Sequence, residues 1–393
     1  MRILVWSNSS WTCTGYGVQT NLFAPRIQGL GHEVGIFAFY GLEGRVLNVQ
    51  GPRGGIPVYP RFQHPYGVDV AGAHAQHFQA DILLSLMDAW VIRPDLLQGV
   101  RWVPWYPVDS EPLPPPVRDA VAKGYRRIVF SRFGERMTKE AGLDCYYVPH
   151  GVDTNEYHPL PMSEARERLK WDADRYIVSI VAANKGAPSR KAFYPQFRAF
   201  AAFHKKHPDT LLYVHSNTAE HGENGGENLP EMAKYVGLEV GKDITFNDQY
   251  LNQFGYPDAY LNDVYNASDV KMLVSMGEGF GVPILEAQAA GCPVIVGDWT
   301  AMSELCFAGW KVDKREAEPF HTPLNCDQYY PRWGAILDRL DAAYEMRGNM
   351  DYRKRARDGA VKYDADKITA DYWQPVLADI EKSVNLWKKP GAK

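Results

Sequence analysis

Short apolar runs alternate with helix-period segments along nearly the whole chain. The run Ile3 to Trp6 is followed by a helical pattern over residues 18–30, and Gly31 separates that pattern from the next apolar run at 33–39. This alternation is typical of parallel sheets whose two faces are covered by helices. A length of 393 residues also exceeds the roughly 250 to 300 residues that one hydrophobic core organises. The sequence therefore predicts an α/β protein with two domains.

The alternation breaks at residues 149–174, which contain several prolines, a glycine and many charges. Such composition is typical of a linker. We expect a first domain over residues 1–155 and a second over 156–365.

The final segment, 366–393, reads mainly as one long amphipathic helix. We expect it to cross back to the first domain and to be kinked by Pro375. Its expected apolar face consists of Tyr372, Trp373, Leu377 and Ile380.

The composition, with 45% hydrophobic residues and a net charge of −4, is that of a globular protein and argues against nucleic acid as a partner. Five cysteines without a C-x-x-C pair suit reduced thiols, and no apolar run is long enough for a signal peptide or a membrane span. We therefore expect a cytoplasmic protein.

Basic residues outnumber acidic ones between 118 and 139. This pattern favours a solvated helix face, and a peripheral membrane contact is the alternative.

The stretch 277–296, GEGFGVPILEAQAAGCPVIV, carries the chemistry. Pro283 suits the first position of a helix, so the preceding loop points free N–H groups and a positive helix end at one spot. That loop has three glycines, which let backbone approach a ligand closely: Gly277, Gly279 and Gly281. The segment therefore predicts an anion site.

Two carboxylates flank this expected anion site, Glu278 in the loop and Glu286 in what we take to be the first turn of the helix. Carboxylates accept hydrogen bonds from hydroxyl-rich ligands. A diphosphate with sugar hydroxyls at either end, as in a nucleotide sugar, would suit both features. The alternative is a buried turn whose glutamates only support the helix dipole.

The run Glu278 to Val294 resembles the Glu-x7-Glu hallmark of the family-four retaining glycosyltransferases. Residues 131–133, 148–159 and 265–270 resemble further family segments at matching intervals. The resemblance implies the GT-B fold, in which two Rossmann-like, doubly wound domains face each other across a cleft. The second domain would hold a nucleotide-sugar donor, with a UDP- or GDP-sugar favoured, and the first would receive a hydroxyl acceptor.

The resemblance also assigns roles to individual residues. Glu278 would contact the donor sugar as a catalytic group, and Glu286 would contact the ribose hydroxyls. The loop backbone at Phe280, Gly281 and Val282 would meet the sugar or the phosphates.

Cations for the phosphates are expected between residues 183 and 191. Lys191 falls where the family has a lysine, and Lys185 falls near the position of its arginine, although Arg190 or Asn184 could act instead. A solvated basic turn is the alternative.

Two backbone sites complete the expected set. Thr300, Ala301 and Met302 lie where the family places another helix N-terminus against the diphosphate. The loop Gly15, Tyr16 and Gly17 lies where the family has an acceptor-side glycine loop, although a simple tight turn explains it equally well.

The chain departs from the family at 102–112, where members carry a histidine near the reacting sugar and this sequence has none. Asp109 is the nearest polar substitute, as a catalytic group or a loop anchor, and Asp88 and Glu111 are its rivals. The D-x-D runs at 172–174 and 364–366 lie beside helix starts, where capping explains them. We expect neither a metal nor another cofactor.

Other functions stay open at this point. An oxidoreductase would need a third glycine after Gly17 and an acidic end to the strand at 33–39, which the sequence lacks. An epimerase or phosphorylase with the GT-B fold and an inactive sugar-nucleotide binder are the remaining alternatives. The sequence does not define the base, the sugar, the acceptor, the linkage or the oligomeric state.

Overall fold

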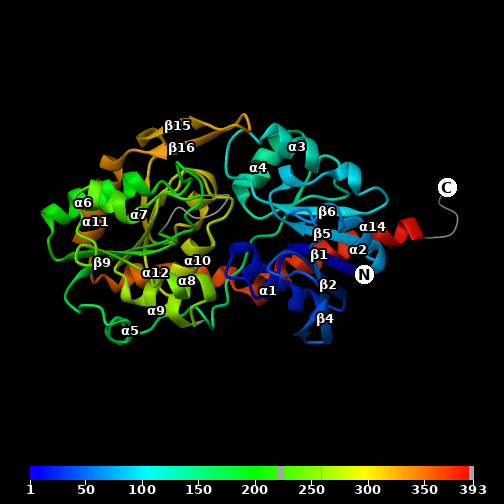
Figure 1. Ribbon diagram of the computed structural model, residues 1–393, viewed down its shortest axis with the longest axis horizontal. Coiled ribbons are helices and arrows are strands. Elements are labelled where there is room, and N and C mark those ends of the chain that lie inside the picture. Colours follow the sequence, from blue (N-terminus) through cyan, green and yellow to red (C-terminus); the bar gives the residue numbers. More distant parts are fainter. Residues whose placement is uncertain (219–224, 258, 389–393) are drawn as a thin grey trace. The chain divides into compact units, whose positions relative to one another are not determined.

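The structure is a computed structural model that describes residues 1–218, 225–257 and 259–388. Packing divides the chain into two compact units (Figure 1). Unit 1 comprises Met1–Gly151, Pro323–Cys326 and Tyr363–Lys393, whereas unit 2 comprises Val152–Thr322 and Asp327–Lys362. The chain thus leaves unit 1 after Gly151 and returns to it at Tyr363.

Unit 1 is built on an eight-stranded sheet with the order β3-β4-β2-β1-β5-β6-β7-β8. Only β3 runs antiparallel to its neighbour among these described strands, so the other strands end at one common edge. The order reverses direction between β1 and β5, which is the place where open α/β sheets bind ligands. The strands are β1 (Arg2–Asn8), β2 (Glu33–Tyr40), β3 (Leu47–Gly51), β4 (Gly54–Pro60), β5 (Ile82–Leu86), β6 (Trp102–Tyr106), β7 (Ile128–Val129) and β8 (Tyr146–Tyr147).

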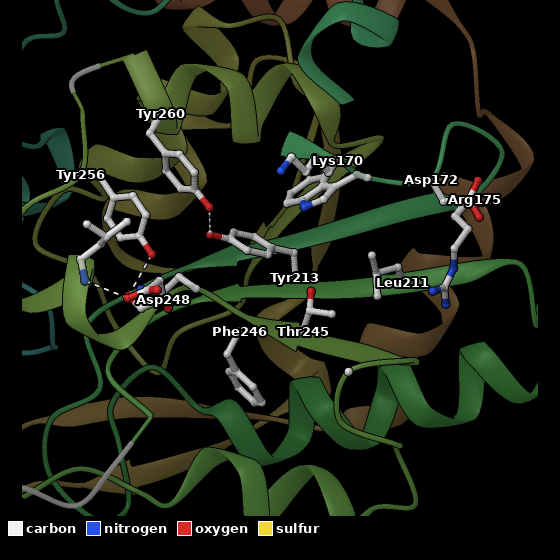
Figure 2. Close-up of a pocket in the computed structure, with 14 residues that line it drawn as sticks. Lys170, Asp172, Arg175, Leu211, Tyr213, Thr245, Phe246, Asp248, Tyr256 and Tyr260 are labelled. Carbon is white, nitrogen blue, oxygen red and sulfur yellow. Dashed lines mark hydrogen bonds between the residues drawn. The ribbon is translucent and has the colours of Figure 1, made fainter. Parts of the chain in front are cut away.

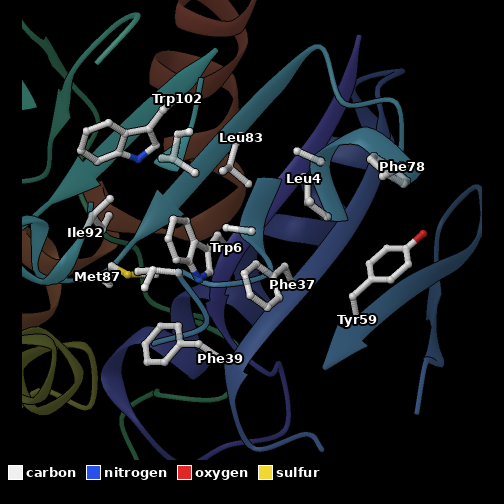
Figure 3. Close-up of a cluster of buried hydrophobic side chains, with 14 of the residues drawn as sticks. Leu4, Trp6, Phe37, Phe39, Tyr59, Phe78, Leu83, Met87, Ile92 and Trp102 are labelled. Atoms are coloured by element: carbon white, nitrogen blue, oxygen red, sulfur yellow. The ribbon is translucent and has the colours of Figure 1, made fainter. Parts of the chain in front are cut away.

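Aromatic side chains fill much of the core under this sheet (Figure 3). Trp6 stacks on Phe37 at 5.5 Å between ring centroids, and its indole N–H donates to the Tyr66 carbonyl. The helices of this part of the chain are α1 (Gly15–Gly29), α2 (Ala71–His77), α3 (Pro115–Val121) and α4 (Arg132–Glu140), with 3-10 turns η1 (Ala89–Val91) and η2 (Pro94–Leu96).

The C-terminal segment belongs to unit 1, but it is not the single regular helix that the sequence suggested. It consists of α13 (Ala365–Ile368), a π-helical turn η6 (Thr369–Trp373) and α14 (Gln374–Lys388). The irregularity falls immediately before Pro375, which has no N–H for a helical hydrogen bond. Trp373 is fully buried, with its ring 5.9 Å from Phe23 and 4.8 Å from Trp105.

Unit 2 contains a six-stranded parallel sheet with the order β11-β10-β9-β12-β13-β14 and a separate antiparallel pair. The sheet strands are β9 (Tyr176–Val181), β10 (Thr210–His215), β11 (Ile244–Phe246), β12 (Val270–Leu273), β13 (Val294–Gly297) and β14 (Gly309–Val312), and the pair is β15 (Ala317–His321) with β16 (Asp327–Pro331).

Helices flank the unit 2 sheet, and α6 buries the phenylalanine stripe Phe193, Phe197, Phe200 and Phe203 completely. The helices are α5 (Met162–Leu169), α6 (Phe193–Lys206), α7 (Leu229–Tyr235), α8 (Gln249–Phe254), α9 (Ala259–Ala267), α10 (Val282–Ala289), α11 (Trp333–Glu345) and α12 (Met350–Ala360), with 3-10 turns η3 (Thr300–Leu305) and η4 (Lys314–Glu316); a further turn, η5 (Val361–Tyr363), leads back to unit 1. Among the described helices, none combines the length and apolar character needed to cross a membrane.

Candidate functional site

The central feature of unit 2 is the loop that joins β12 to α10. Gly281 caps α10 with φ of 102°, a left-handed conformation that favours glycine, and Pro283 occupies the first turn of the helix. Glu286 is the fifth residue of α10 and so lies just past the first turn in which the sequence suggested it, because the helix begins at Val282. The loop places Glu278 before the helix.

Two cations hold the buried side chain of Glu278. Lys191 Nζ lies 2.5 Å from Glu278 Oε1, and an Arg190 guanidinium nitrogen lies 3.3 Å from Oε2. Arg190 also donates to the Gly277 carbonyl. Burial alone would raise the pKa of Glu278, but the charges of Lys191 and Arg190 outweigh it and lower that pKa to about 2. Glu278 is therefore a carboxylate at every physiological pH.

The backbone of Glu278 is tied to the start of η3. The Glu278 N–H donates to Thr300 Oγ1 at 3.1 Å, and the Ala301 N–H donates to the Glu278 carbonyl at 3.3 Å. Thr300 and Met302 are buried, and Thr300 has φ of 52°. The Ala301 N–H is therefore already hydrogen-bonded within the protein. A role for Thr300, Ala301 and Met302 in binding the donor stays a prediction.

Glu286 has a different environment from Glu278. Its Oε2 accepts a hydrogen bond from the Tyr265 hydroxyl at 3.0 Å. Burial raises the pKa of Glu286 to about 7, although the Tyr265 hydrogen bond opposes this shift. The two glutamates of the motif therefore differ in charge state near neutral pH.

Lys271 on β12 is a component of this region that the sequence reasoning missed. Its side chain is completely buried, and Nζ has no hydrogen-bond partner among the described residues. Burial, reinforced by the charge of Lys191, lowers the pKa of Lys271 to about 7, whereas Glu278 and Glu286 act in the opposite direction. A lysine inside the apolar run Val270 to Leu273 was the signal that could have identified it.

The remaining candidates between 183 and 191 do not share one environment. The buried Asn184 amide donates to the Asn217 and Glu227 carbonyls, at 3.0 and 2.7 Å, and accepts from the Glu227 N–H at 2.9 Å. Asn184 thus holds two loop segments together, whereas Lys185 is exposed. The structure brings Lys191 and Arg190 to Glu278.

In unit 1, the glycines near residue 15 do not form a free loop. Gly15, Tyr16 and Gly17 are the first turn of α1, where the Thr14 side chain caps the helix by accepting from the Gly17 N–H at 3.1 Å. A Cβ on Gly17 would lie 2.2 Å from Thr12 Oγ1, so close packing requires glycine there. The structure thus shows Gly15, Tyr16 and Gly17 as a helix start, and their acceptor-side role stays a prediction.

Polar candidates of unit 1 lie at the shared edge where its parallel strands end. The Tyr16 hydroxyl lies 3.4 Å from Asp88 Oδ2, next to the end of β5. Asp109 and Glu111 follow β6 and are both half-buried. The catalytic role of Asp109 stays a prediction, with Asp88 and Glu111 as its rivals.

A cavity of about 400 Å³ in unit 2 involves none of the predicted residues. It lies along β10 and β11, and Figure 2 shows Tyr213 and Tyr260 pointing at each other inside it. Their hydroxyls are 3.0 Å apart, and the Tyr256 and Tyr260 rings stack at 4.2 Å. Burial lowers the pKa of the adjacent His215 to about 4. Within the described parts of the chain, no three His, Cys, Asp or Glu side chains gather as metal ligands would.

Comparison with known proteins places the site in a family context. Residues 180–322 match the family described as glycosyl transferases group 1. Mannosylfructose-phosphate synthase of Agrobacterium fabrum is 28% identical over 159 residues, which cover 38% of this chain and 32% of that enzyme. The alignment therefore spans about a third of the relative's length.

Solved structures resemble the chain over nearly its full length. Sucrose-phosphate synthase from Thermosynechococcus elongatus superposes with a TM-score of 0.70 at 16% identity, covering 98% of each chain. Anabaena HepE in complex with UDP-glucose gives a TM-score of 0.69 at 17% identity, covering 98% of this chain and 100% of HepE. At these identities the likeness shows the fold.

Proposed function

We propose that this chain, which matches the group 1 glycosyl transferases over residues 180–322 and has the GT-B fold, is a glycosyltransferase that moves a hexosyl group from a nucleotide sugar to a hydroxyl acceptor with retention of configuration. We favour a UDP- or GDP-sugar as donor. The observation of UDP-glucose in HepE supports the first of these.

One observation carries the proposal. A buried carboxylate, Glu278, is held by Lys191 and Arg190 directly before the N-terminus of α10, and Glu286 is buried in the same helix. Cations and a helix N-terminus favour an anion, whereas carboxylates favour hydroxyls. A nucleotide sugar offers both kinds of group in one molecule. The whole arrangement lies in the matched segment.

The cations can offset the charge of the leaving diphosphate. Lys191 has three N–H donors and Arg190 has five, so each can hold Glu278 and still donate to phosphate oxygens. Donors that are fixed before the reaction stabilise developing charge without reorganisation. We therefore propose turnover that does not depend on a metal.

The carboxylates have separate roles in this proposal. Glu278, permanently ionised, would accept from a hydroxyl of the donor sugar and stabilise positive charge that develops at the anomeric carbon. Glu286 would accept from the ribose hydroxyls, far from the reacting bond. Asp109 of unit 1 would take the place of the histidine that related enzymes carry.

The experiment is a panel of UDP, GDP, ADP and TDP sugars, tested first by thermal shift. A ligand at about 100 times its dissociation constant stabilises the fold by roughly 2.7 kcal/mol, which is measurable. The donor so identified is then incubated with and without acceptors, and nucleotide release is followed. Binding without release under any condition would favour an inactive binder, and the absence of any stabilising ligand would contradict the proposal.

A further inference from the structure

Exposed aromatic side chains gather at one edge of unit 1. Its four exposed aromatic residues, within the described part of the chain, each follow or end a strand of the parallel sheet. Phe62 follows β4, Tyr40 ends β2, Trp11 follows β1 and Trp90 follows β5. Their exposed fractions are 68%, 57%, 44% and 48%. We call these four residues the aromatic row.

The strand order gives the sequence in which the four residues follow one another along the sheet edge. The strands β4, β2, β1 and β5 are consecutive in the sheet and parallel to one another. Neighbouring strands lie about 4.8 Å apart, so four consecutive strand ends span roughly 14 Å. A span of this order suits a ligand made of several linked sugar rings.

The row is held in place and is not purely apolar. The Trp11 indole N–H donates to the Gly41 carbonyl at 3.0 Å, which fixes the ring while leaving much of it exposed. Glu43 and Arg61 form an ion pair and, with Tyr40, line a cavity of about 360 Å³. Asp88, two residues before Trp90 in the sequence, accepts a hydrogen bond from the Tyr16 hydroxyl. Charged groups thus accompany the rings.

This combination matches the chemistry of a saccharide. A sugar ring presents a face of C–H groups that stacks on an aromatic ring and an edge of hydroxyls that bonds to carboxylates and guanidinium groups. The edge is also the one where open α/β sheets bind their ligands, and Trp11 and Trp90 lie on either side of the reversal in strand order. A lipid surface fits less well, because Glu43 and Asp88 would have to approach anionic headgroups.

We infer that the aromatic row is the binding site for an oligosaccharide acceptor, with successive sugar rings stacked along Phe62, Tyr40, Trp11 and Trp90. This inference rests on the proposed function and specifies its acceptor class. It predicts that the acceptor is recognised as a chain of sugars rather than as one hydroxyl.

The first test measures binding to the protein without donor. A glycan array and intrinsic tryptophan fluorescence are used with mono-, di- and tetrasaccharides of glucose, mannose, galactose and N-acetylglucosamine. We expect at least one tetrasaccharide to bind about tenfold more tightly than its monosaccharide, a difference of about 1.4 kcal/mol. The absence of any binding, or equal binding of both lengths, would overturn the inference.

Variants then identify the surface. Trp11→Ala and Phe62→Ala should each weaken tetrasaccharide binding about tenfold. Tyr235→Ala, which removes an even more exposed ring from unit 2, should leave it unchanged. Circular dichroism checks that each variant is folded, and Trp11→Phe, which keeps a ring, should recover most of the affinity. Full affinity in both alanine variants would contradict the row as the site.

Two further measurements separate this inference from its premise and from the membrane alternative. Slow donor hydrolysis by the wild type is measured without acceptor. Hydrolysis in the wild type together with failure of all glycans would reject the acceptor class alone, whereas no donor turnover at all would count against the proposed function. Binding to phosphatidylglycerol vesicles that is lost in Trp11→Ala would assign the row to a lipid surface and overturn the inference.

Discussion

Replacing the buried Lys271 by methionine should stabilise the protein, although it removes a charged group next to the site. Methionine has a similar length and fills the same space without an amine. Lys271 Nζ has no hydrogen-bond partner among the described residues, so the substitution breaks no hydrogen bond. It removes the cost of keeping an ammonium group out of water.

The magnitude follows from the pKa of Lys271, which is about 7 against an ordinary value of 10.5. One pKa unit corresponds to about 1.4 kcal/mol, so the buried amine costs at most about 5 kcal/mol. The nearby Glu278 and Glu286 attract the ammonium and oppose part of the lowering. Because Lys271→Met also removes this attraction, we expect a net increase in the free energy of unfolding of about 2 to 4 kcal/mol at pH 6.5. This corresponds to an increase in Tm of some 4 to 16 °C for a unit of this size.

The pH dependence has a definite sign. Between pH 7 and pH 10.5 the unfolded chain binds a proton at Lys271 that the folded chain does not bind, so wild-type stability rises with pH in that window. The advantage of Lys271→Met is therefore full below pH 7 and shrinks as the pH rises toward 10.

Thermal unfolding of both proteins at pH 6.5 and 9.5 measures this difference. Lys205→Met, which replaces an exposed lysine, is the matched control and should change little at either pH. A Lys271→Met variant that is less stable than the wild type at pH 6.5, or a difference that does not change with pH, would refute the reasoning.

The remaining predictions concern the donor site. Glu286→Ala should raise the donor KM and change kcat little, because a contact to the ribose is similar in the ground and transition states. The pKa of Glu286 is about 7, so the wild-type donor KM should rise as the pH falls from 8 to 6, and Glu286→Gln should abolish that dependence. Lys191→Met should reduce kcat/KM by about a hundredfold, since it leaves Glu278 with less compensation and removes a phosphate donor. EDTA should leave the initial rate nearly unchanged; loss of activity that magnesium restores would rule out metal-independent turnover.

The parts of the fold that follow a strict period could be predicted from sequence. The stripe from Phe193 to Phe203 has helical spacing and is buried in α6, and the central strands of both sheets are short apolar runs. The strands β3 and β4 were not predicted, because their mixed sequence, with Gly51, Gly54 and Gly55, contains no apolar run. The central strands were identified by apolar runs, and this signal is absent from β3 and β4 although β4 pairs with a neighbour on each side.

The candidate site was predictable where a residue has a fixed place in a motif and less so where tertiary contacts decide. The motif identified Glu278 and Glu286 together, but not that Lys191 and Arg190 would meet Glu278 across many intervening residues. The role of Lys271 depends on burial between strands, which a single sequence does not state. The family resemblance suggested a glycine loop at Gly15 and Gly17, whereas the structure shows a helix start in which close packing against Thr12 requires Gly17.

The central claim is that unit 2 binds a nucleotide sugar at Glu278 and cleaves it during transfer. Steady-state nucleotide release, measured side by side for the wild type and Glu278→Gln with the identified donor and acceptor, tests it most directly. Losing one charge-assisted contact, worth about 1.5 to 3 kcal/mol, predicts a kcat about ten- to a hundredfold lower in Glu278→Gln, with a smaller change in KM. Release at the wild-type rate by Glu278→Gln, or no release by the wild type with any donor of the panel, would contradict the claim.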